Sequence, residues 1–332
     1  MVTTDSIINL CIFLTSILLN GVVLSLYPHF KINGRMNAGN LVIFLQSMID
    51  IVLSTTSLIF YTEIIASDLH VSIHLVNFDQ FELSLNAYII CVLIYSSTLS
   101  FNFFMIALTI WTRYVAISGI YLLKIKTLLS IFFINIVVAI SLCVIIFYYG
   151  VDRDADPNII YKFYQQNNYT DPYITPTTRS ISFKTNDFKV IIISIPIILF
   201  INTNVFIIFK YLRKYRVYMK SKFSSMSAKT RTLGYNFLRI LFLQICNPIV
   251  FLFVPTLVYI IAVFIKLDVR AFGIIIFQLS SIVSPLNALF ILICLTKSRK
   301  IITNRFNKIM FQILSQKKKA LANASTNITP QM

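Results

Sequence analysis

Residues 127–149 read TLLSIFFINIVVAISLCVIIFYY, a stretch without a single Asp, Glu, Lys or Arg. A helix needs about 20 consecutive, mostly apolar residues to cross the hydrocarbon core of a bilayer. Apolar residues dominate the stretch from end to end, whereas the strands of a membrane β-barrel alternate between apolar and polar residues. It therefore predicts a helix that spans a membrane.

Six further stretches of this kind lie on either side of it. Five contain no charged residue, and the sixth contains Asp50 and Glu63. Backbone polar groups find no partners in lipid, so each span should be helical. The sequence thus predicts an all-α membrane protein, a bundle of seven transmembrane helices near residues 7–28, 41–66, 85–110, 127–149, 190–209, 240–265 and 271–295.

The composition of the whole chain agrees with this prediction. Of its 332 residues 57% are hydrophobic and 12% are charged, whereas about 25% are charged in an average soluble protein. So few charged residues could not cover a soluble protein of this size, which argues against soluble enzymes and nucleic-acid-binding domains. The five cysteines lie inside apolar stretches and lack the spacing of a zinc site or a disulfide framework.

The charged residues divide between alternate loops. Four segments carry 22 of the 29 Lys and Arg and no Asp or Glu: 29–40, 111–126, 210–239 and 296–332. The intervening segments carry ten of the twelve acidic residues: 1–6, 67–84, 150–189 and 266–270. Because cytoplasmic loops are enriched in Lys and Arg, we expect the N-terminus outside and the C-terminus inside. Basic loops facing anionic lipid also explain the net charge of +17 without nucleic acid.

The chain should divide into a seven-helix domain, residues 1–310, and a basic, polar cytoplasmic tail, residues 311–332. Within 298–314, apolar residues recur at helical spacing beside basic ones, which predicts a short amphipathic helix on the inner membrane surface. The sequon at Asn168 lies in an outer segment and is a candidate glycosylation site. The sequons at Asn323 and Asn327 lie in the predicted inner tail, where they should stay unmodified.

Signals of catalysis or metal binding are weak. His70 and His74 have the spacing of a helical metal pair, but a third ligand is lacking, so we expect no metal site there. Asp50 and Glu63 stand 13 residues apart in one span, which is about 20 Å along a helix. That distance is too long for one acid–base pair, and we expect no enzymatic activity and no organic cofactor.

Asp50 is the most informative single residue. A carboxylate in hydrocarbon is costly and marks a candidate functional site. Polar residues at matching depth could gather around it and hold a sodium ion with water: Asn20, Asn102, Ser280, Ser281 and Asn287. A protonated Asp50 that only bonds neighbouring helices is the structural alternative, and a transporter would use similar residues.

Residues 110–117, IWTRYVAI, end the third span at the inner face. This segment resembles the end of helix three in rhodopsin-like G-protein-coupled receptors, Asp-Arg-Tyr followed by an apolar, a small and an apolar residue. Here Thr112, Arg113 and Tyr114 stand in those places, with Thr for Asp. The resemblance implies that Arg113 locks the inner ends of helices three and six and then contacts the G protein. The alternative is an ordinary positive anchor at the inner face.

Further residues resemble the family's marks in the other helices. Asn20 is similar to the helix-one Asn, and Asp50 to the helix-two Asp that binds sodium in many members. The resemblance also covers the helix kinks and switches: Pro196 in the fifth helix, Pro248 and Phe253-Val254-Pro255 in the sixth, and Ser284-Pro285-Leu286-Asn287-Ala288 in the seventh. In that last motif Ser replaces Asn and Ala replaces Tyr. Each proline removes a helix hydrogen bond and bends the helix.

The departures from the family are also informative. Segment 150–189 has no Cys, so the usual bridge from helix three to the second outer loop cannot form in its usual place. The fourth span lacks the family's Trp, since the only Trp is Trp111. These losses exclude a close match to amine or peptide receptors. With the chain's size, its Phe, Tyr and Ile content and its basic inner loops, it most resembles nematode serpentine chemoreceptors.

This resemblance implies a chemosensory receptor in the plasma membrane, such as that of a sensory cell, that binds an external small molecule or peptide and activates a heterotrimeric G protein. Pocket candidates, chosen by depth alone, are Tyr95, Ser194, Tyr259, Phe277 and Gln278; core packing is the alternative role for each. A seven-helix ligand-gated channel or transporter is the alternative function. The lack of a repeat argues against a transporter, and the basic inner loops argue against an inverted channel.

Overall fold

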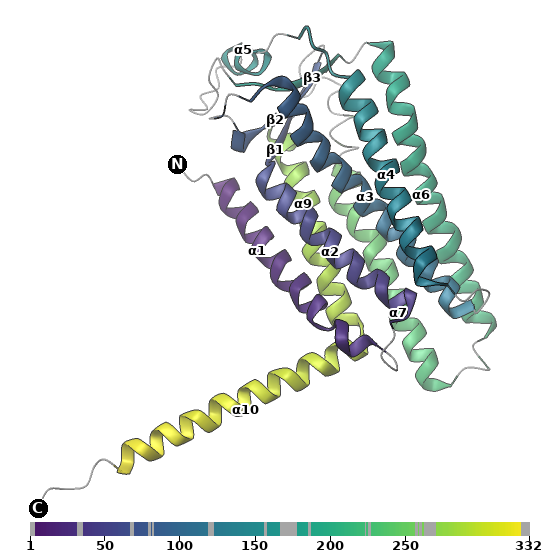
Figure 1. Ribbon diagram of the computed structural model, residues 1–332, viewed down its shortest axis with the longest axis vertical. Helices are drawn as coiled ribbons and strands as arrows, with labels where there is room; N and C mark the ends of the chain where they lie inside the picture. The colour runs from purple at the N-terminus through teal and green to yellow at the C-terminus, as the bar shows by residue number, and fades with distance from the viewer. Residues whose placement is uncertain are drawn as a thin grey trace, which may run out of the picture.

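The computed structural model describes residues 4–31, 36–66, 70–78, 81, 83–118, 123–155, 158–166, 178–184, 187–222, 224, 227–255, 258, 261 and 270–326. Long helices lie side by side in a bundle, with a small sheet at one end and a long helix that projects from the other end (Figure 1). The sheet end lies beside the start of α1, and the projecting helix leads to the C-terminus (Figure 1).

The helices of the bundle have these bounds: α1 Thr4–Ser25, α2 Ala38–Ile59, α3 Leu85–Ser118, α4 Ile125–Tyr149, α6 Phe188–Ser221, α7 Ala228–Pro248 and α9 Arg270–Cys294. α7 continues as a π-helix, η3, over Ile249–Phe253. Shorter elements are η1 (Tyr27–Phe30), η2 (Val76–Phe78) and α5 (Ile159–Gln166), and the projecting helix is α10 (Thr296–Thr326). Among the described residues, side chains cap the starts of three of these helices: Asn37 accepts from the Gly39 amide in α2, Ser84 from the Ala87 amide in α3, and Asp187 from the Lys189 amide in α6.

Among the residues that the structure describes, six helices are long and apolar enough to cross a membrane. They lie in α1, α2, α3, α4, α9 and the stretch Gly234–Leu252 of α7 and η3. The expected fifth span falls in α6, where the side chains at 191, 194 and 197 lie outside the described residues. Much of the expected sixth span beyond residue 255 also lies outside them.

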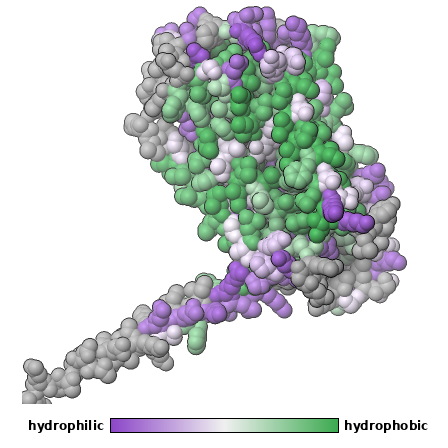
Figure 2. Space-filling model, viewed as in Figure 1, coloured by the Kyte–Doolittle hydropathy of each residue, from purple (hydrophilic) through white to green (hydrophobic). Residues whose placement is uncertain are grey.

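The flank of the bundle is apolar. Figure 2 shows hydrophobic residues over the sides of the helices, and hydrophilic residues at the sheet end and on the part of α10 nearest the bundle. On α4, Phe133, Ile134 and Val137 are at least 60% exposed. An apolar belt of this extent is typical of a protein surrounded by lipid rather than water.

α3 lies inside the bundle and packs against α2, α4, α6 and α7. Its buried residues Phe101, Met105 and Leu108 meet Val42 of α2 and Phe132 of α4 in one apolar cluster. A second cluster joins α1, α2 and α9 near the end where α10 begins, around Val23, Phe44 and Leu292. These contacts hold the polar residues of the candidate site between α1, α2, α3 and α9.

The prediction of an all-α protein holds for most of the described chain but not at one end of the bundle. Three strands, β1 (Thr62–Ala66), β2 (His70–Leu75) and β3 (Ile181–Lys184), form an antiparallel sheet in the order β1-β2-β3. The expected second span, 41–66, therefore ends as a helix at Ile59. The strands are rich in β-branched Thr, Ile and Val, which favour sheets, and pairing supplies the backbone hydrogen bonds that the helix no longer provides.

Several helices extend beyond the expected spans. α3 continues past residue 110 to Ser118, α6 continues past 209 to Ser221, and α7 begins at Ala228 rather than near 240. The expected short amphipathic helix over 298–314 is also longer, because α10 spans 31 residues. Its second half contains no Gly or Pro and several Ala, Lys, Gln and Leu, which are good helix formers. Hydropathy marks only the part of a helix that suits lipid, so it misses these extensions.

Candidate functional site

Asp50 lies fully buried in α2. Its Oδ1 atom accepts hydrogen bonds from Nδ2 of Asn102 on α3 (2.6 Å), Nε2 of Gln46 one turn earlier (3.0 Å) and Nδ2 of Asn287 on α9 (3.5 Å). One carboxylate oxygen thus joins three helices. Asn102 and Asn287 were predicted to gather around Asp50, and Gln46 was not.

A cluster of hydroxyl groups links Asp50 to α1. Ser284 of α9 donates through Oγ to the Asp50 carbonyl oxygen (2.8 Å), and its Oγ lies 2.6 Å from Oγ of Ser16 and 2.9 Å from Oγ of Ser54. Asn20 donates to the Ser16 carbonyl oxygen (3.0 Å). Asn20 therefore joins the cluster through serines and not by a bond to Asp50 itself. Ser284 stands where the resemblance places an Asn. Its hydroxyl, on α9, bonds groups of both α1 and α2.

The same network reaches α7. Nδ2 of Asn247 donates to Oδ1 of Asn287 (3.0 Å) and to the Val283 carbonyl oxygen (2.8 Å) of α9. Asn247 directly precedes Pro248, after which the π-helix begins. A side-chain network therefore runs from α1 and α2 through α9 to the point where α7 changes its winding. Sequence reasoning missed Asn247, although an amide next to a proline in an apolar stretch is a usable signal.

Several buried oxygens around Asp50 have no hydrogen-bond partner within the described part of the chain: Asp50 Oδ2, Gln46 Oε1, Ser47 Oγ, Asn20 Oδ1 and Asn247 Oδ1. Buried polar atoms are usually satisfied. Oxygen atoms from carboxylate, amide and hydroxyl groups are the ligands that hard cations prefer. The side chains present are therefore compatible with a sodium ion or water at Asp50.

Ser280 and Ser281, also predicted for this cluster, take partners elsewhere. Both donate through Oγ to the Phe277 carbonyl oxygen, at 2.7 and 3.0 Å. The Ser280 hydroxyl also lies 3.3 Å from that of Tyr95 on α3. These two serines lie on α9 about one turn nearer the sheet end than Ser284. Ser280 therefore belongs with the aromatic group at that end, which is described next.

Three of the five pocket candidates lie at the sheet end of the bundle. The rings of Tyr95 and Phe277 are in contact, with centroids 5.6 Å apart, and Tyr95 is buried. Nε2 of Gln278 lies 3.4 Å from the Tyr61 hydroxyl, just before β1. The side chain of Ser194 and all of Tyr259 lie outside the described residues.

The sheet covers this group as a lid, which comprises β1, β2, β3 and α5. Oε2 of buried Glu63 on β1 lies 3.6 Å from Nδ1 of His74 on β2, and Tyr164 of α5 donates to Oε1 of Glu63 (3.3 Å). At Gly273 of α9, an added Cβ would come within 2.1 Å of the Ile64 carbonyl oxygen. β1 therefore packs directly on the backbone of α9.

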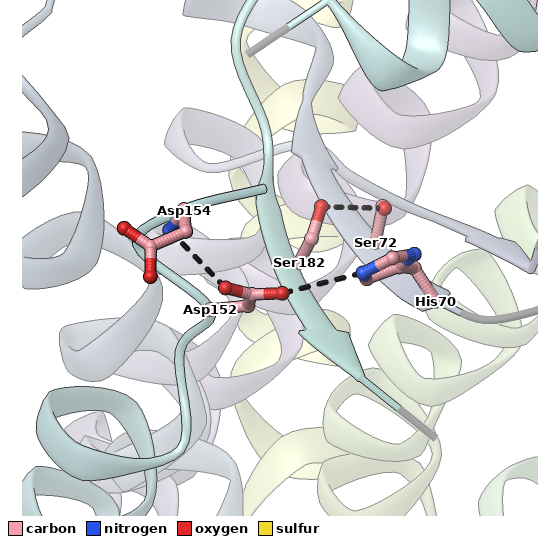
Figure 3. Close-up of polar contacts among 5 residues, drawn as sticks. All are labelled: His70, Ser72, Asp152, Asp154 and Ser182. Carbon is pink, nitrogen blue, oxygen red and sulfur yellow. Dashed lines mark hydrogen bonds and ion pairs between the residues drawn. The ribbon is translucent and has the colours of Figure 1, made fainter. Parts of the chain in front are cut away.

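His70 and Asp152 make a further contact across the sheet, with Nε2 and Oδ2 3.3 Å apart, while the Ser72 and Ser182 hydroxyls lie 2.8 Å apart (Figure 3). His70 and His74 thus lie on a strand rather than a helix and face different carboxylates. Among the described residues, no group of three or more His, Cys, Asp and Glu could hold a metal.

Arg113 lies near the other end of α3 and is 8% exposed. Its Nη1 atom donates to Oδ1 of Asn40 at the start of α2 (3.4 Å). Gly39 packs beside this contact, and a Cβ added there would make an ordinary van der Waals contact with Nη1, 3.6 Å away. Arg113 also interacts electrostatically with Tyr215 of α6; burial raises the pKa of Tyr215 to about 12, and Arg113 opposes that shift.

The two neighbours of Arg113 make separate contacts. Thr112 is buried and donates to the Thr109 carbonyl oxygen (3.0 Å), one turn earlier in α3. The ring of Tyr114 lies 5.5 Å from that of Tyr211 on α6, and Nζ of Lys214 lies over both rings. Arg113 and Tyr114 therefore join the end of α3 to α2 and α6, whereas the bond of Thr112 stays within α3. Sequence reasoning missed Asn40 and Tyr215, because neither residue belongs to a family motif.

The predicted kinks lie in three helices. Pro196 is inside α6, Pro285 is inside α9, and Pro248 ends the α-helical part of α7. The chain is π-helical directly after Pro248, as expected where a proline removes a backbone donor. The side chain of Phe253 and the sequon at Asn168 lie outside the described residues.

A model of the family described as serpentine type 7TM GPCR chemoreceptor Str matches residues 5–303. The chain belongs to this chemoreceptor family. The crystal structure of squid rhodopsin matches this chemoreceptor with a TM-score of 0.57 and 13% identity, over 93% of this chain and 87% of that chain. No curated protein matches significantly. The predicted resemblance is thereby confirmed: the protein is a membrane chemoreceptor of the G-protein-coupled type with a rhodopsin-like fold, and neither family nor fold is that of an enzyme.

Proposed function

We propose that this chemoreceptor lies in the plasma membrane of a sensory cell with seven spans, binds an external ligand at the sheet end and activates a heterotrimeric G protein at the Arg113 end. The observation that carries the proposal is the buried polar network around Asp50. It joins α1, α2, α3, α9 and α7 midway between the outer aromatic group and Arg113.

The distribution of charge supports this orientation. The basic segments that meet the end of α3 carry no acidic residue, whereas the lid segments carry Asp and Glu. The third inner segment, 210–239, has nine Lys and Arg and is the surface we assign to the G protein. Glycosylation of Asn168 would follow from the same orientation.

The ligand is proposed to bind beneath the lid, against Tyr95, Phe277 and Gln278. Ser280, which contacts Tyr95, lies one turn from Ser284, so a ligand that shifts α9 also changes the bonds at Asp50. Asn247 passes that change to α7, whose π-helical segment allows its inner part to move. A ligand favours the active packing by its higher affinity for it.

A sodium ion is part of this proposal. Asp50 Oδ2, Gln46 Oε1, Ser47 Oγ and Asn20 Oδ1 are the atoms we assign to it, because they are buried without another partner in the described chain. A bound cation would neutralise Asp50 and hold the helices in one packing. Water molecules would complete its coordination.

Agonist-driven nucleotide exchange tests the proposed function. The receptor is screened in cells against small molecules, and GTP binding to a co-expressed G protein is measured with Arg113→Ala and with Arg153→Ala, an exposed arginine outside segment 210–239, as a charge-matched control. We expect Arg113→Ala to abolish the response at unchanged surface expression and Arg153→Ala to retain most of it. A ligand-gated current without nucleotide exchange would favour the channel alternative instead.

A further inference from the structure

A cavity of about 420 Å³ lies between α3, α4 and α6. Its walls are mainly apolar and aromatic, and include Phe104, Leu108, Trp111, Ile131 and Phe200. Its volume falls within the range of about 300–1,000 Å³ that is usual for small-molecule sites. It is separate from the outer aromatic group and from the network at Asp50.

The cavity opens on the apolar flank of the bundle. Phe206 is 64% exposed and Val138 is 38% exposed, and both line it together with exposed Thr203 and Lys210. In a membrane this flank faces lipid tails. The occupant should therefore enter from the bilayer and be largely apolar.

The polar residues of the lining do not oppose an apolar occupant. Nδ2 of Asn135 donates to the Ile131 carbonyl oxygen and Nδ2 of Asn204 donates to that of Phe200, each at 2.8 Å. These amide donors are satisfied within their own helices, so an acyl chain leaves them bonded.

One end of the cavity is positively charged. Lys210 lines it, and Lys214 follows one turn later, with Nζ 5.6 Å from the ring of Tyr211, which also lines the cavity. Tyr211 contacts Tyr114, so this end lies level with Arg113, at the proposed inner face. The segments assigned to that face contain no Asp or Glu to neutralise the two lysines. Anionic lipids supply negative charge at this depth.

We propose that the cavity binds one acyl chain of an anionic phospholipid from the inner leaflet, with the headgroup phosphate at Lys210 and Lys214. The apolar walls hold the chain, and the two ammonium groups select the charge of the headgroup. The bound lipid would also contact both α3 and α6, the helices that carry Arg113 and Tyr215.

Trp111 offers a direct test, because it is the only tryptophan of the chain and lines the cavity. The receptor is reconstituted in phosphatidylcholine vesicles that contain a fixed fraction of lipid with brominated chains, which quench tryptophan fluorescence on contact. We expect brominated phosphatidylserine to quench Trp111 at least twofold more than brominated phosphatidylcholine at the same fraction. Equal quenching of the wild-type receptor by the two lipids would overturn the proposal.

Variants separate this site from general attraction to a basic surface. Lys210→Gln with Lys214→Gln should remove the excess quenching by phosphatidylserine, whereas the control Arg216→Gln with Lys220→Gln, on the exposed far part of α6, should retain it. Thr203→Phe, which fills the cavity without changing charge, should reduce quenching by both lipids. Equal loss in the two charge variants would contradict the proposal. A competition experiment gives a second contradicting outcome. If a brominated fatty acid quenches Trp111 and excess phosphatidylserine does not relieve that quenching, the site binds a free fatty acid rather than a phospholipid.

Discussion

Asp50 accepts every hydrogen bond described for its carboxylate through one oxygen, while the second oxygen is buried without a partner in the described chain. This asymmetry is the residue-scale basis for the proposed sodium site. Three amide donors hold the carboxylate in place, and the unused oxygen remains available to a cation or water. Replacing the acid by its amide keeps the size of the side chain and removes its charge.

The wild-type receptor is therefore expected to have a higher melting temperature in sodium chloride than in choline chloride at the same ionic strength. Asp50→Asn should abolish this rise, because the amide offers no negative charge to the ion. Glu63→Gln is the matched control, since Glu63 is also a buried carboxylate but belongs to the lid. A sodium effect that persists in Asp50→Asn would leave Asp50 with a structural role only.

The partners of Asp50 show what the sequence allows at this scale. Depth follows from the rise of a helix, about 1.5 Å per residue, and it correctly placed Asn102 and Asn287 beside Asp50. Depth does not tell which way a side chain faces around the helix axis. Ser280 and Ser281 were expected near Asp50 from their depth, but they bond the Phe277 carbonyl oxygen instead. Gln46, Ser16 and Ser54 were missed because single amides and hydroxyls in apolar helices carry no motif.

At the scale of elements, the lid rests on α9 through a backbone contact. Gly273 leaves no room for a side chain, because an added Cβ would lie 2.1 Å from the Ile64 carbonyl oxygen of β1. A Cβ added at Gly21 of α1 would meet no atom within 4 Å. Gly21 can therefore serve as the control for a substitution at Gly273, since both are glycines inside a helix.

Gly273→Ala should therefore separate β1 from α9, lower the melting temperature of the receptor and weaken any ligand response. Gly21→Ala should be neutral or stabilise by about 0.5–1 kcal/mol, as Ala is the better helix former. Thermal unfolding in detergent measures both variants. If Gly273→Ala proved as stable as Gly21→Ala, the direct packing of β1 on α9 would be wrong.

The sheet also joins two distant parts of the chain, because β2 pairs with β1 on one side and with β3, residues 181–184, on the other. Ser72 and Ser182 are directly paired across β2 and β3, and their hydroxyls are 2.8 Å apart. Paired positions in antiparallel strands have Cα separations that suit a disulfide. Ser72→Cys with Ser182→Cys should therefore form a disulfide upon oxidation.

That bond should stabilise the receptor by about 2–4 kcal/mol, and reduction should reverse the gain. The measurement is the melting temperature with and without a reducing agent, together with free-thiol counting by mass spectrometry. Either single Cys variant serves as the control. Two free thiols in the oxidised double variant, beyond those of the wild type, would show that the strands do not pair in this register.

The sheet was not predictable from local sequence. Thr62–Ala66 continues an apolar stretch and resembles the end of a span, while its sheet includes β3 more than 100 residues later. The long helices, in contrast, follow from hydropathy alone, because lipid imposes the same requirement on every residue of a span. The extensions of α3, α6 and α7 lie beyond the apolar spans, where this requirement no longer applies and hydropathy does not mark the helix.

At the scale of the whole molecule, three features lie in order along the bundle. The lid and the aromatic group occupy one end, the network at Asp50 lies between, and Arg113 with the opening of the lipid cavity lies toward the other end. This order is the one that the proposed function requires, from an external ligand to an internal G protein. It fails if the chain is inserted the other way round.

Glycosylation mapping therefore tests the central claim most directly. The chain is translated in the presence of microsomes, and modification of Asn168, Asn323 and Asn327 is read from mobility shifts of single Asn→Gln variants, with a sequon engineered in segment 67–84 as a positive control. The account predicts modification at Asn168 and in segment 67–84 but not in the tail. Modification at Asn323 or Asn327 would place the Arg113 end outside and contradict a receptor that acts on an intracellular G protein.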